Sequence, residues 1–160
     1  MKSLVVYYSR GGNTRQVAQE IAAAAGADSE ELVEEGVNRG GVLGWILAGR
    51  DGARKAQSRI METSRDPSVY DLIFIGSPVW AGNLAQAVRA YLTANKLAGK
   101  KAALFCTCGS SPGKAFESMR ELTAGCDVAG ELAVKAAELK DKGALEAKLK
   151  AWAADVAGKA

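Results

Sequence analysis

Runs of consecutive apolar residues alternate along the chain with segments in which apolar residues recur every three or four positions. Continuous or alternating apolar runs predict strands at Lys2–Tyr8, Asp28–Glu35, Asp71–Pro78, Lys101–Cys106 and Gly130–Val134. The three- to four-residue period predicts helices at Asn13–Ala25, Leu84–Leu97, Lys114–Ala124 and Lys142–Val156. We expect the strand that starts at Asp71 to end at Gly76-Ser77-Pro78.

This alternation of strands and helices is typical of βαβ units, which form a parallel sheet covered on both faces. Five strands in 160 residues predict an α/β fold, an open doubly wound five-stranded parallel sheet of order 2-1-3-4-5. No internal repeat or linker interrupts the pattern. We therefore expect one domain over residues 1–160, with an extended connection at 36–60 between the second and third strands.

Three loops rich in small and polar residues leave this sheet at the carboxyl ends of its strands: Ser9–Thr14, Ser77–Asn83 and Thr107–Gly113. Ligands of open α/β sheets bind at this edge. In the first loop, Gly11 and Gly12 allow close approach of backbone amides, and the following helix directs its free N–H groups there. The loop matches neither G-x-x-x-x-G-K-[ST] nor G-x-G-x-x-G, which argues against nucleoside triphosphates and dinucleotides. The alternative is that Ser9 or Asn13 only caps the helix.

The sequence "YYSRGGNT", followed by a helix, resembles the phosphate-loop signature of the flavodoxin family, and "GSPVWAGNLAQAVRAYL" resembles that family's second loop and next helix. The resemblance implies a flavodoxin-like fold with FMN as cofactor. It implies that the phosphate is bound by Ser9, Arg10, Gly11, Gly12, Asn13 and Thr14. It implies that the ring and ribityl chain lie against Ser77, Pro78, Val79, Trp80, Ala81, Gly82 and Asn83. The far side of the ring would be closed by Thr107, Cys108 and Gly109.

Trp80 is poorly placed for the core, because it lies between Pro78 and Gly82 on a loop. Its indole can stack on a flat ring and shield it from water; the alternative is that it packs on its own helix. The resemblance also implies that the Ala81–Gly82 peptide rotates to hydrogen-bond a reduced flavin. Gly82 would make that rotation easy, since glycine tolerates positive φ.

Composition limits the chemistry of the chain. It contains no histidine, which excludes Ser-His-Asp and Cys-His nucleophilic sites and imidazole metal sites, so we predict no catalytic residue and no metal. The net charge of +3 is too small, and the basic residues too scattered, for a nucleic-acid partner. No apolar run reaches the ~20 residues of a membrane span. Without a signal-peptide pattern we expect a cytoplasmic protein.

The segment from Gly36 to Arg65 carries six basic residues and two acidic ones. One interpretation is a sheet-covering helix with a solvated basic face. The other is a docking surface beside the cofactor, with Trp45 as an apolar floor and Arg50, Arg54 or Lys55 attracting an acidic partner or a phosphorylated nicotinamide.

Three cysteines, Cys106, Cys108 and Cys126, leave an odd count. Cys106 and Cys108 point the same way only if the strand continues past Cys106. Buried free thiols are the common interpretation, and a redox disulfide is the alternative.

Three functions remain open. The first is an electron carrier that exchanges electrons with redox partner proteins, favoured because no acid, base or nucleophile is evident near the cofactor. The second is an NAD(P)H-dependent FMN or quinone reductase on the same fold, which is favoured by the excess of basic over acidic residues and by the basic segment. The third is a non-redox module that binds another phosphate compound.

Overall fold

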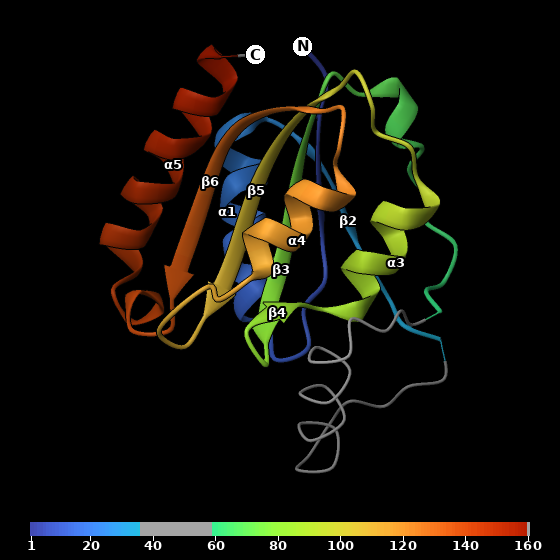
Figure 1. Ribbon diagram of the computed structural model, residues 1–160. Helices are drawn as coiled ribbons and strands as arrows, with labels where there is room; N and C mark the ends of the chain where they lie inside the picture. Colours follow the sequence, from blue (N-terminus) through green and yellow to red (C-terminus); the bar gives the residue numbers. More distant parts are fainter. Residues whose placement is uncertain (36–58, 160) are drawn as a thin grey trace.

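The computed structural model describes residues 1–35 and 59–159, and its centre is a twisted sheet (Figure 1). The sheet has the order β2-β1-β3-β5-β6, with a short β4 paired to β3 off this path. All neighbours on the main path are parallel, and β4 is antiparallel to β3. The predicted α/β class and the 2-1-3-4-5 order of the parallel strands are therefore confirmed. The strands are β1 (Ser3–Tyr7), β2 (Asp28–Glu31), β3 (Leu72–Trp80), β4 (Asn83–Leu84), β5 (Lys101–Cys108) and β6 (Asp127–Lys135).

Helices cover both faces of the sheet, with α1 and α5 on one face and α3 and α4 on the other (Figure 1). Two single-turn 3-10 helices, η1 (Pro67–Val69) and η2 (Glu138–Lys140), lie in connections. None of the helices in the described part of the chain is long and apolar enough to cross a membrane. The α-helices are α1 (Asn13–Ala25), α3 (Gln86–Ala94), α4 (Ala115–Leu122) and α5 (Lys142–Gly158).

The core consists of two apolar layers, because successive strand residues point to opposite faces of the sheet. Leu4 and Ile73 pack under α3 and α4, whereas their neighbours Val5 and Phe74 pack under α1 and α5. All four side chains are fully buried. The continuous apolar runs of the sequence therefore supply both layers at once.

One part of the α5 face is built from aromatic rings. Trp152 packs edge-on against Phe74 and Phe105, with ring centroids 5.7 and 6.4 Å apart. Gly76 in β3 makes room for the Phe105 ring, since a Cβ at Gly76 would lie 2.1 Å from its Cζ atom. Sequence position 76 therefore has to lack a side chain if this aromatic cluster is to form.

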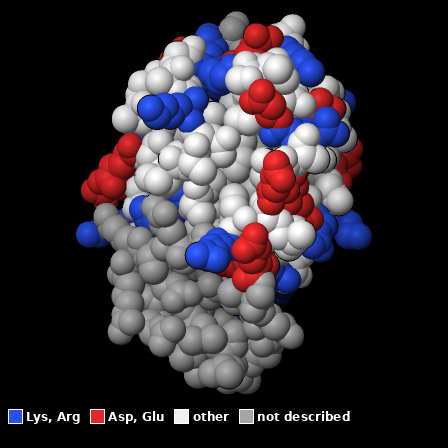
Figure 2. Space-filling model, turned by 90° about the vertical axis from the view of Figure 1, so that its right-hand side faces the viewer, with Lys and Arg blue, Asp and Glu red and all other residues white. Residues whose placement is uncertain are grey.

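The edge strand β2 is protected by the chain that follows residue 59. Arg65 forms an ion pair with Asp28 at 3.2 Å, and both the backbone N–H and the hydroxyl of Ser64 donate to Glu30. Such polar cover keeps an edge strand from pairing with another chain. On the side of the molecule seen in Figure 2, basic and acidic side chains are interspersed among the described residues.

Eight predicted boundaries were wrong by two to four residues. In four of these places, α3 ends at Ala94 instead of Leu97, α4 ends at Leu122 instead of Ala124, α5 ends at Gly158 instead of Val156, and β6 begins at Asp127 instead of Gly130.

The other four follow from how the strands pair. The strand expected to end at Pro78 continues to Trp80, because β1 ends at Tyr7 and leaves that side of β3 open, where proline is tolerated. The next helix starts at Gln86 rather than Leu84, since residues 83–84 turn back as β4. β5 continues beyond Cys106 to Cys108, where β6 still pairs with it.

The last of these boundaries concerns β2, which ends at Glu31 instead of Glu35. The N–H of Leu32 still donates to the Tyr7 carbonyl at 2.7 Å, and Glu34 then forms an antiparallel bridge with Ile60. The prediction of a basic connection at 36–60, with its possible docking residues Trp45, Arg50, Arg54 and Lys55, lies almost entirely outside the described residues.

Candidate functional site

A cavity of about 260 Å³ opens at the carboxyl ends of the strands. All three predicted loops contribute to it, as expected for the switch point between β1 and β3. The residues that line it are Ser9, Arg10, Gly11, Asn13, Thr14, Pro78, Val79, Trp80, Thr107, Cys108, Gly109, Ala136 and Leu139.

Two lining residues, Ala136 and Leu139, were missed by the sequence analysis. They follow β6, whose carboxyl end opens at the same edge of the sheet as those of β1, β3 and β5. The rule that ligands bind at the carboxyl ends of parallel strands could therefore have included them. The N–H of Ala136 donates to the Cys108 carbonyl at 2.8 Å, which joins the last connection to the third loop. Five predicted residues are not among those lining the cavity: Gly12, Ser77, Ala81, Gly82 and Asn83.

The first loop turns sharply into α1. The Ser9 hydroxyl accepts the Gly12 N–H at 3.1 Å, and Gly12 adopts a φ of +95° that disfavours any side chain. No side chain within residues 1–35 or 59–159 caps α1, so neither Ser9 nor Asn13 has the capping role considered above. The amides of the first helical turn are therefore left to an external acceptor, and the positive end of the helix dipole favours an anion there.

The first and third loops are tied together by Thr14 and Thr107. Their hydroxyl oxygens lie 2.8 Å apart in a buried hydrogen bond, and both residues line the cavity. One hydrogen is shared between the two oxygens, so the second hydroxyl hydrogen can still be donated elsewhere. This pair places a polar donor between the two loops.

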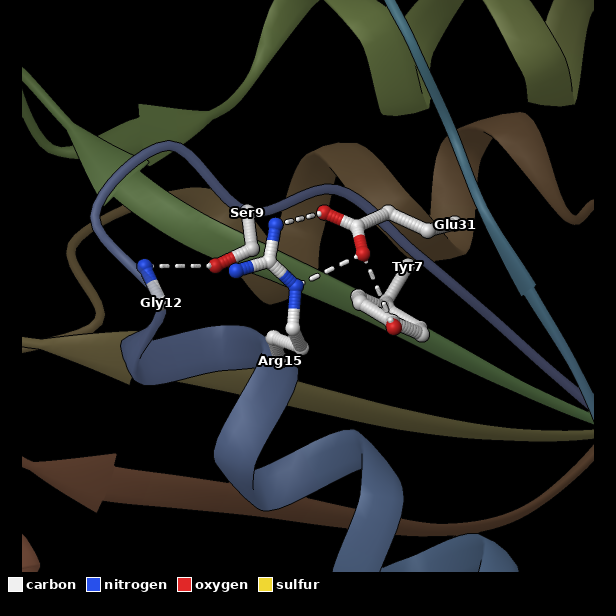
Figure 3. Close-up of polar contacts among 5 residues, drawn as sticks. All are labelled: Tyr7, Ser9, Gly12, Arg15 and Glu31. Atoms are coloured by element: carbon white, nitrogen blue, oxygen red, sulfur yellow. Dashed lines mark hydrogen bonds and ion pairs between the residues drawn. The ribbon is translucent and has the colours of Figure 1, made fainter.

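Arg15, in the first turn of α1, is held by Glu31 of the edge strand β2 (Figure 3). Its Nε and Nη2 donate to the two carboxylate oxygens of Glu31, at 2.8 and 2.6 Å. The Tyr7 hydroxyl donates to the same carboxylate at 3.1 Å. Burial, with Glu31 as a second cause, raises the pKa of Tyr7 to about 12, so Tyr7 stays a donor near neutral pH. Arg15 is thus a neutralised cation beside the loop.

The second loop carries Trp80 into the cavity wall. Its ring meets the Tyr8 ring edge-on at a centroid distance of 5.5 Å, and the Arg10 guanidinium carbon lies 5.3 Å from the indole centroid. Tyr8 in turn donates its hydroxyl to Glu34 at 2.8 Å. Trp80 therefore lies between a buried tyrosine and a cation, with part of its surface in the cavity.

The β3–β4 hairpin turns on Ala81 and Gly82, whose φ angles are +47° and +72°. Two central residues with positive φ define a type I′ turn. Rotating the central peptide of such a turn produces a type II′ turn, in which the first position favours glycine. Ala81 therefore opposes the peptide rotation that the sequence analysis attributed to Gly82.

The third loop packs tightly on this hairpin. The Gly82 carbonyl accepts the Lys114 N–H at 2.7 Å, and a Cβ at Gly113 would lie 2.4 Å from the same carbonyl oxygen. The hairpin and the β5–α4 connection therefore meet backbone against backbone.

Ser77 and Asn83 serve the hairpin itself. The Ser77 hydroxyl accepts the Ala85 N–H at 2.8 Å, and the Asn83 side-chain oxygen accepts the Leu84 N–H at 2.9 Å. Both side chains are buried. Their contacts fix the path of the chain from β3 into α3.

None of the three cysteines, all of which lie in the described part of the chain, forms a disulfide. Because β5 continues to Cys108, Cys106 and Cys108 fall on the same face of the strand. Burial raises the pKa of all three thiols, that of Cys106 to about 12. Thiolates are therefore disfavoured near neutral pH, and Cys126 donates to the Leu97 carbonyl.

The sequence matches the family model for flavodoxin over residues 2–156. The chain belongs to the flavodoxin family. A flavoprotein from Lactobacillus acidophilus NCFM, solved in complex with FMN, is 26% identical and superposes with a TM-score of 0.71, over 89% of this chain and 98% of that one. Two-electron reduced flavodoxin from Megasphaera elsdenii is 27% identical, with a TM-score of 0.56 over 96% of this chain and 98% of that one.

Among curated proteins, this flavodoxin-family chain is similar to NAD(P)H dehydrogenase (quinone) 3 of Rhizobium meliloti (strain 1021). The two are 32% identical over 127 residues, or 70% of this chain. The matched region covers 55% of that relative, so the chain spans about half its length.

Proposed function

We propose that this chain binds FMN in the cavity at the carboxyl ends of its strands and transfers electrons through it. The observation that carries the proposal is the convergence of an uncapped helix N-terminus, a half-buried indole and the third loop on one cavity. The first of these suits a phosphate and the second suits a flat aromatic ring. Family membership and the FMN complex of the Lactobacillus relative support the same cofactor.

The donor set fits the parts of FMN. The phosphate would be held by uncharged donors, namely the side chains of Ser9, Asn13 and Thr14 and the amides at the start of α1. Arg10 would add a charged donor. Apolar lining from Val79, Trp80 and Leu139 would receive the ring, while Thr107 supplies a hydroxyl between the loops. Bound FMN supplies the electron-accepting and electron-donating chemistry, and the protein supplies binding, orientation and exclusion of water.

Between the two redox functions, we favour the electron carrier. None of the residues that line the cavity is a carboxylate, and the chain has no histidine, so the described cavity offers no conventional acid or base for a substrate. The reductase remains the second candidate, because the Rhizobium relative is named an NAD(P)H dehydrogenase (quinone). The partner in the first case is a redox protein; in the second it is NAD(P)H with a quinone.

FMN binding is tested first, by titrating purified apoprotein into FMN and following the loss of flavin fluorescence. Thr14→Val should weaken binding about 5- to 10-fold, the value of one hydrogen bond. The matched control is Thr123→Val, which removes a buried hydroxyl bonded to the Met119 carbonyl at the far end of α4. Wild-type protein that leaves FMN fluorescence unchanged would contradict the proposal.

The choice between carrier and reductase is tested with the FMN-loaded protein. A carrier accepts electrons from a chemical reductant and passes them to an acceptor protein such as a cytochrome, but does not sustain NADH or NADPH consumption with a quinone. Steady turnover of either nicotinamide with a quinone, well above that of free FMN, would instead establish the reductase.

A further inference from the structure

Two arginines follow β1 within six residues of each other, and only one is neutralised. Arg15 forms a two-pronged ion pair with Glu31 (Figure 3), and its side chain is 45% exposed. Arg10 lines the cavity, and none of the ion pairs among the described residues involves it. Its Nη1 atom is buried and has no hydrogen-bond partner in the part of the chain that the structure describes.

An unpartnered buried N–H of a guanidinium is unfavourable, because it has lost water without gaining an acceptor. None of the described side chains that line the cavity accepts a hydrogen bond from this atom, and Arg10 is the only charged residue among them, so no countercharge faces it there. An anionic ligand would supply both the missing acceptor and the missing countercharge. Guanidinium groups are well suited to phosphate, to which they can donate two parallel hydrogen bonds.

The position of Arg10 is set by Trp80, because the guanidinium lies over the indole at 5.3 Å from its centroid. A cation over an indole face is attracted by the ring, more strongly where water is excluded. Trp80 itself is held edge-on by Tyr8, whose hydroxyl is bonded to buried Glu34. The contact with Trp80 therefore favours this position of the Arg10 guanidinium in the protein without a ligand.

We propose that Arg10 determines the selectivity of this cavity for a phosphorylated flavin over the uncharged flavin nucleoside, and that Trp80 holds Arg10 in place for this purpose. The inference rests on the proposed FMN function and deepens it. The uncharged donors of the loop form hydrogen bonds to the phosphate oxygens. The positive charge of Arg10 makes the negative charge of the phosphate the feature that decides which flavin binds.

The test compares dissociation constants for FMN and riboflavin, measured by flavin fluorescence quenching. In Arg10→Gln, FMN affinity should fall about 10- to 100-fold, the range for a charge-assisted hydrogen bond, while riboflavin affinity stays within about 2-fold. The preference of the wild-type protein for FMN should thus largely disappear. Arg10→Lys, which keeps the charge without the planar fork, should restore part of it.

Arg15→Gln is the matched control, since it removes a nearby cation, in the first turn of α1, that is already paired with Glu31. Its FMN-to-riboflavin ratio should equal that of wild type. Raising salt from 50 to 500 mM should weaken FMN binding in wild type more than in Arg10→Gln, because screening acts on the charge that the variant lacks. Urea midpoints confirm that each variant is folded.

The role of Trp80 is tested by Trp80→Phe, which retains a ring with a weaker attraction for cations. Its FMN-to-riboflavin ratio should lie between those of wild type and Arg10→Gln. An unchanged ratio would overturn the role of Trp80. Equal losses of FMN and riboflavin binding in Arg10→Gln, or no loss of either, would overturn the role of Arg10. Failure of wild type to bind both flavins would instead refute the proposed function.

Discussion

Trp80 and Trp152 occupy opposite kinds of surroundings in the same small protein. Trp152 lies on α5 against Phe74 and Phe105, with the sheet behind them. Trp80 lies at the end of β3 with Tyr8 on its edge, Arg10 over its ring and a cavity beside it. The comparison teaches that one indole contributes mainly to the stability of the fold, and the other to what the fold can bind.

The surroundings of the two tryptophans differ in how many of their polar groups lack a hydrogen-bond partner. Around Trp152 the neighbours are apolar and need no partner. Around Trp80, the described residues include a guanidinium with an unpartnered nitrogen, a helix without a side-chain cap and an alanine at positive φ. Unsatisfied donors and local strain tend to gather at functional sites, where a ligand supplies what is missing.

The largest expected effect separates the two tryptophans directly. Trp152→Ala should lower the free energy of unfolding of the apoprotein by about 3 kcal/mol, because it leaves a cavity between aromatic rings. Trp80→Ala should lower it by only about 1 kcal/mol, yet weaken FMN binding about 10- to 100-fold through lost stacking. Urea unfolding and flavin fluorescence measure the two quantities. Equal stability losses would abolish the distinction.

The second effect compares two glycines, one packed in the core and one in the cavity wall. Gly76→Ala should destabilise the protein by about 1–3 kcal/mol, since the new methyl group overlaps the Phe105 ring. Gly109→Ala, in the cavity wall with no atom of the described residues within 4 Å of the new Cβ, should change stability by less than about 0.5 kcal/mol. Thermal unfolding of both variants provides the measurement. A destabilised Gly109→Ala would show that the cavity wall is packed like the core.

A third effect has the opposite sign. Ala81→Gly should stabilise the apoprotein by about 0.5–1 kcal/mol, because the φ of +47° strains alanine more than glycine loses in entropy. Ala90→Gly, in the middle of α3, should instead cost about 1 kcal/mol. Chemical denaturation of both variants tests the sign. A loss of stability in Ala81→Gly would mean that the turn carries no strain.

The smallest effect depends on pH. Glu138, next to the cavity-lining Leu139, accepts hydrogen bonds from Lys148 and from the Lys135 N–H, and mainly the Lys148 bond lowers its pKa below the ordinary 4.5. Its stabilising contribution is complete above that value and is lost as pH falls through the lowered pKa.

Glu138→Gln should therefore lower the free energy of unfolding by about a few tenths of a kcal/mol at pH 7, because solvent screens this exposed ion pair. At pH 2 the substitution should leave the free energy of unfolding unchanged. Urea midpoints at the two pH values measure the difference. A loss of the same size at both would show that the charge of Glu138 is not the cause.

Much of this architecture could be predicted from the sequence. Apolar runs indicated the strands, and the three- to four-residue period of apolar positions indicated the four α-helices of the described chain. The position of the cavity followed from the rule that ligands bind at the carboxyl ends of parallel strands. These features depend on local patterns repeated over many residues.

Other features depend on contacts that no local pattern records. The extension of β3 past Pro78 depends on where β1 ends, and the ring of Tyr8 meets Trp80 only because the sheet brings the two strands together. Likewise, Arg10 and Arg15 look equivalent in the sequence. Their difference appears only when Glu31, at the end of β2, is found beside one of them and not the other.

The contact between the Gly82 carbonyl and the Gly113–Lys114 backbone has a practical consequence for redesign. It sets the spacing of two cavity walls by main-chain atoms alone. Lining residues such as Val79 and Gly109 can therefore be varied so that the cavity binds other aromatic ligands, while the distance between its two walls is preserved. Any residue larger than glycine at position 113 would instead push the walls apart.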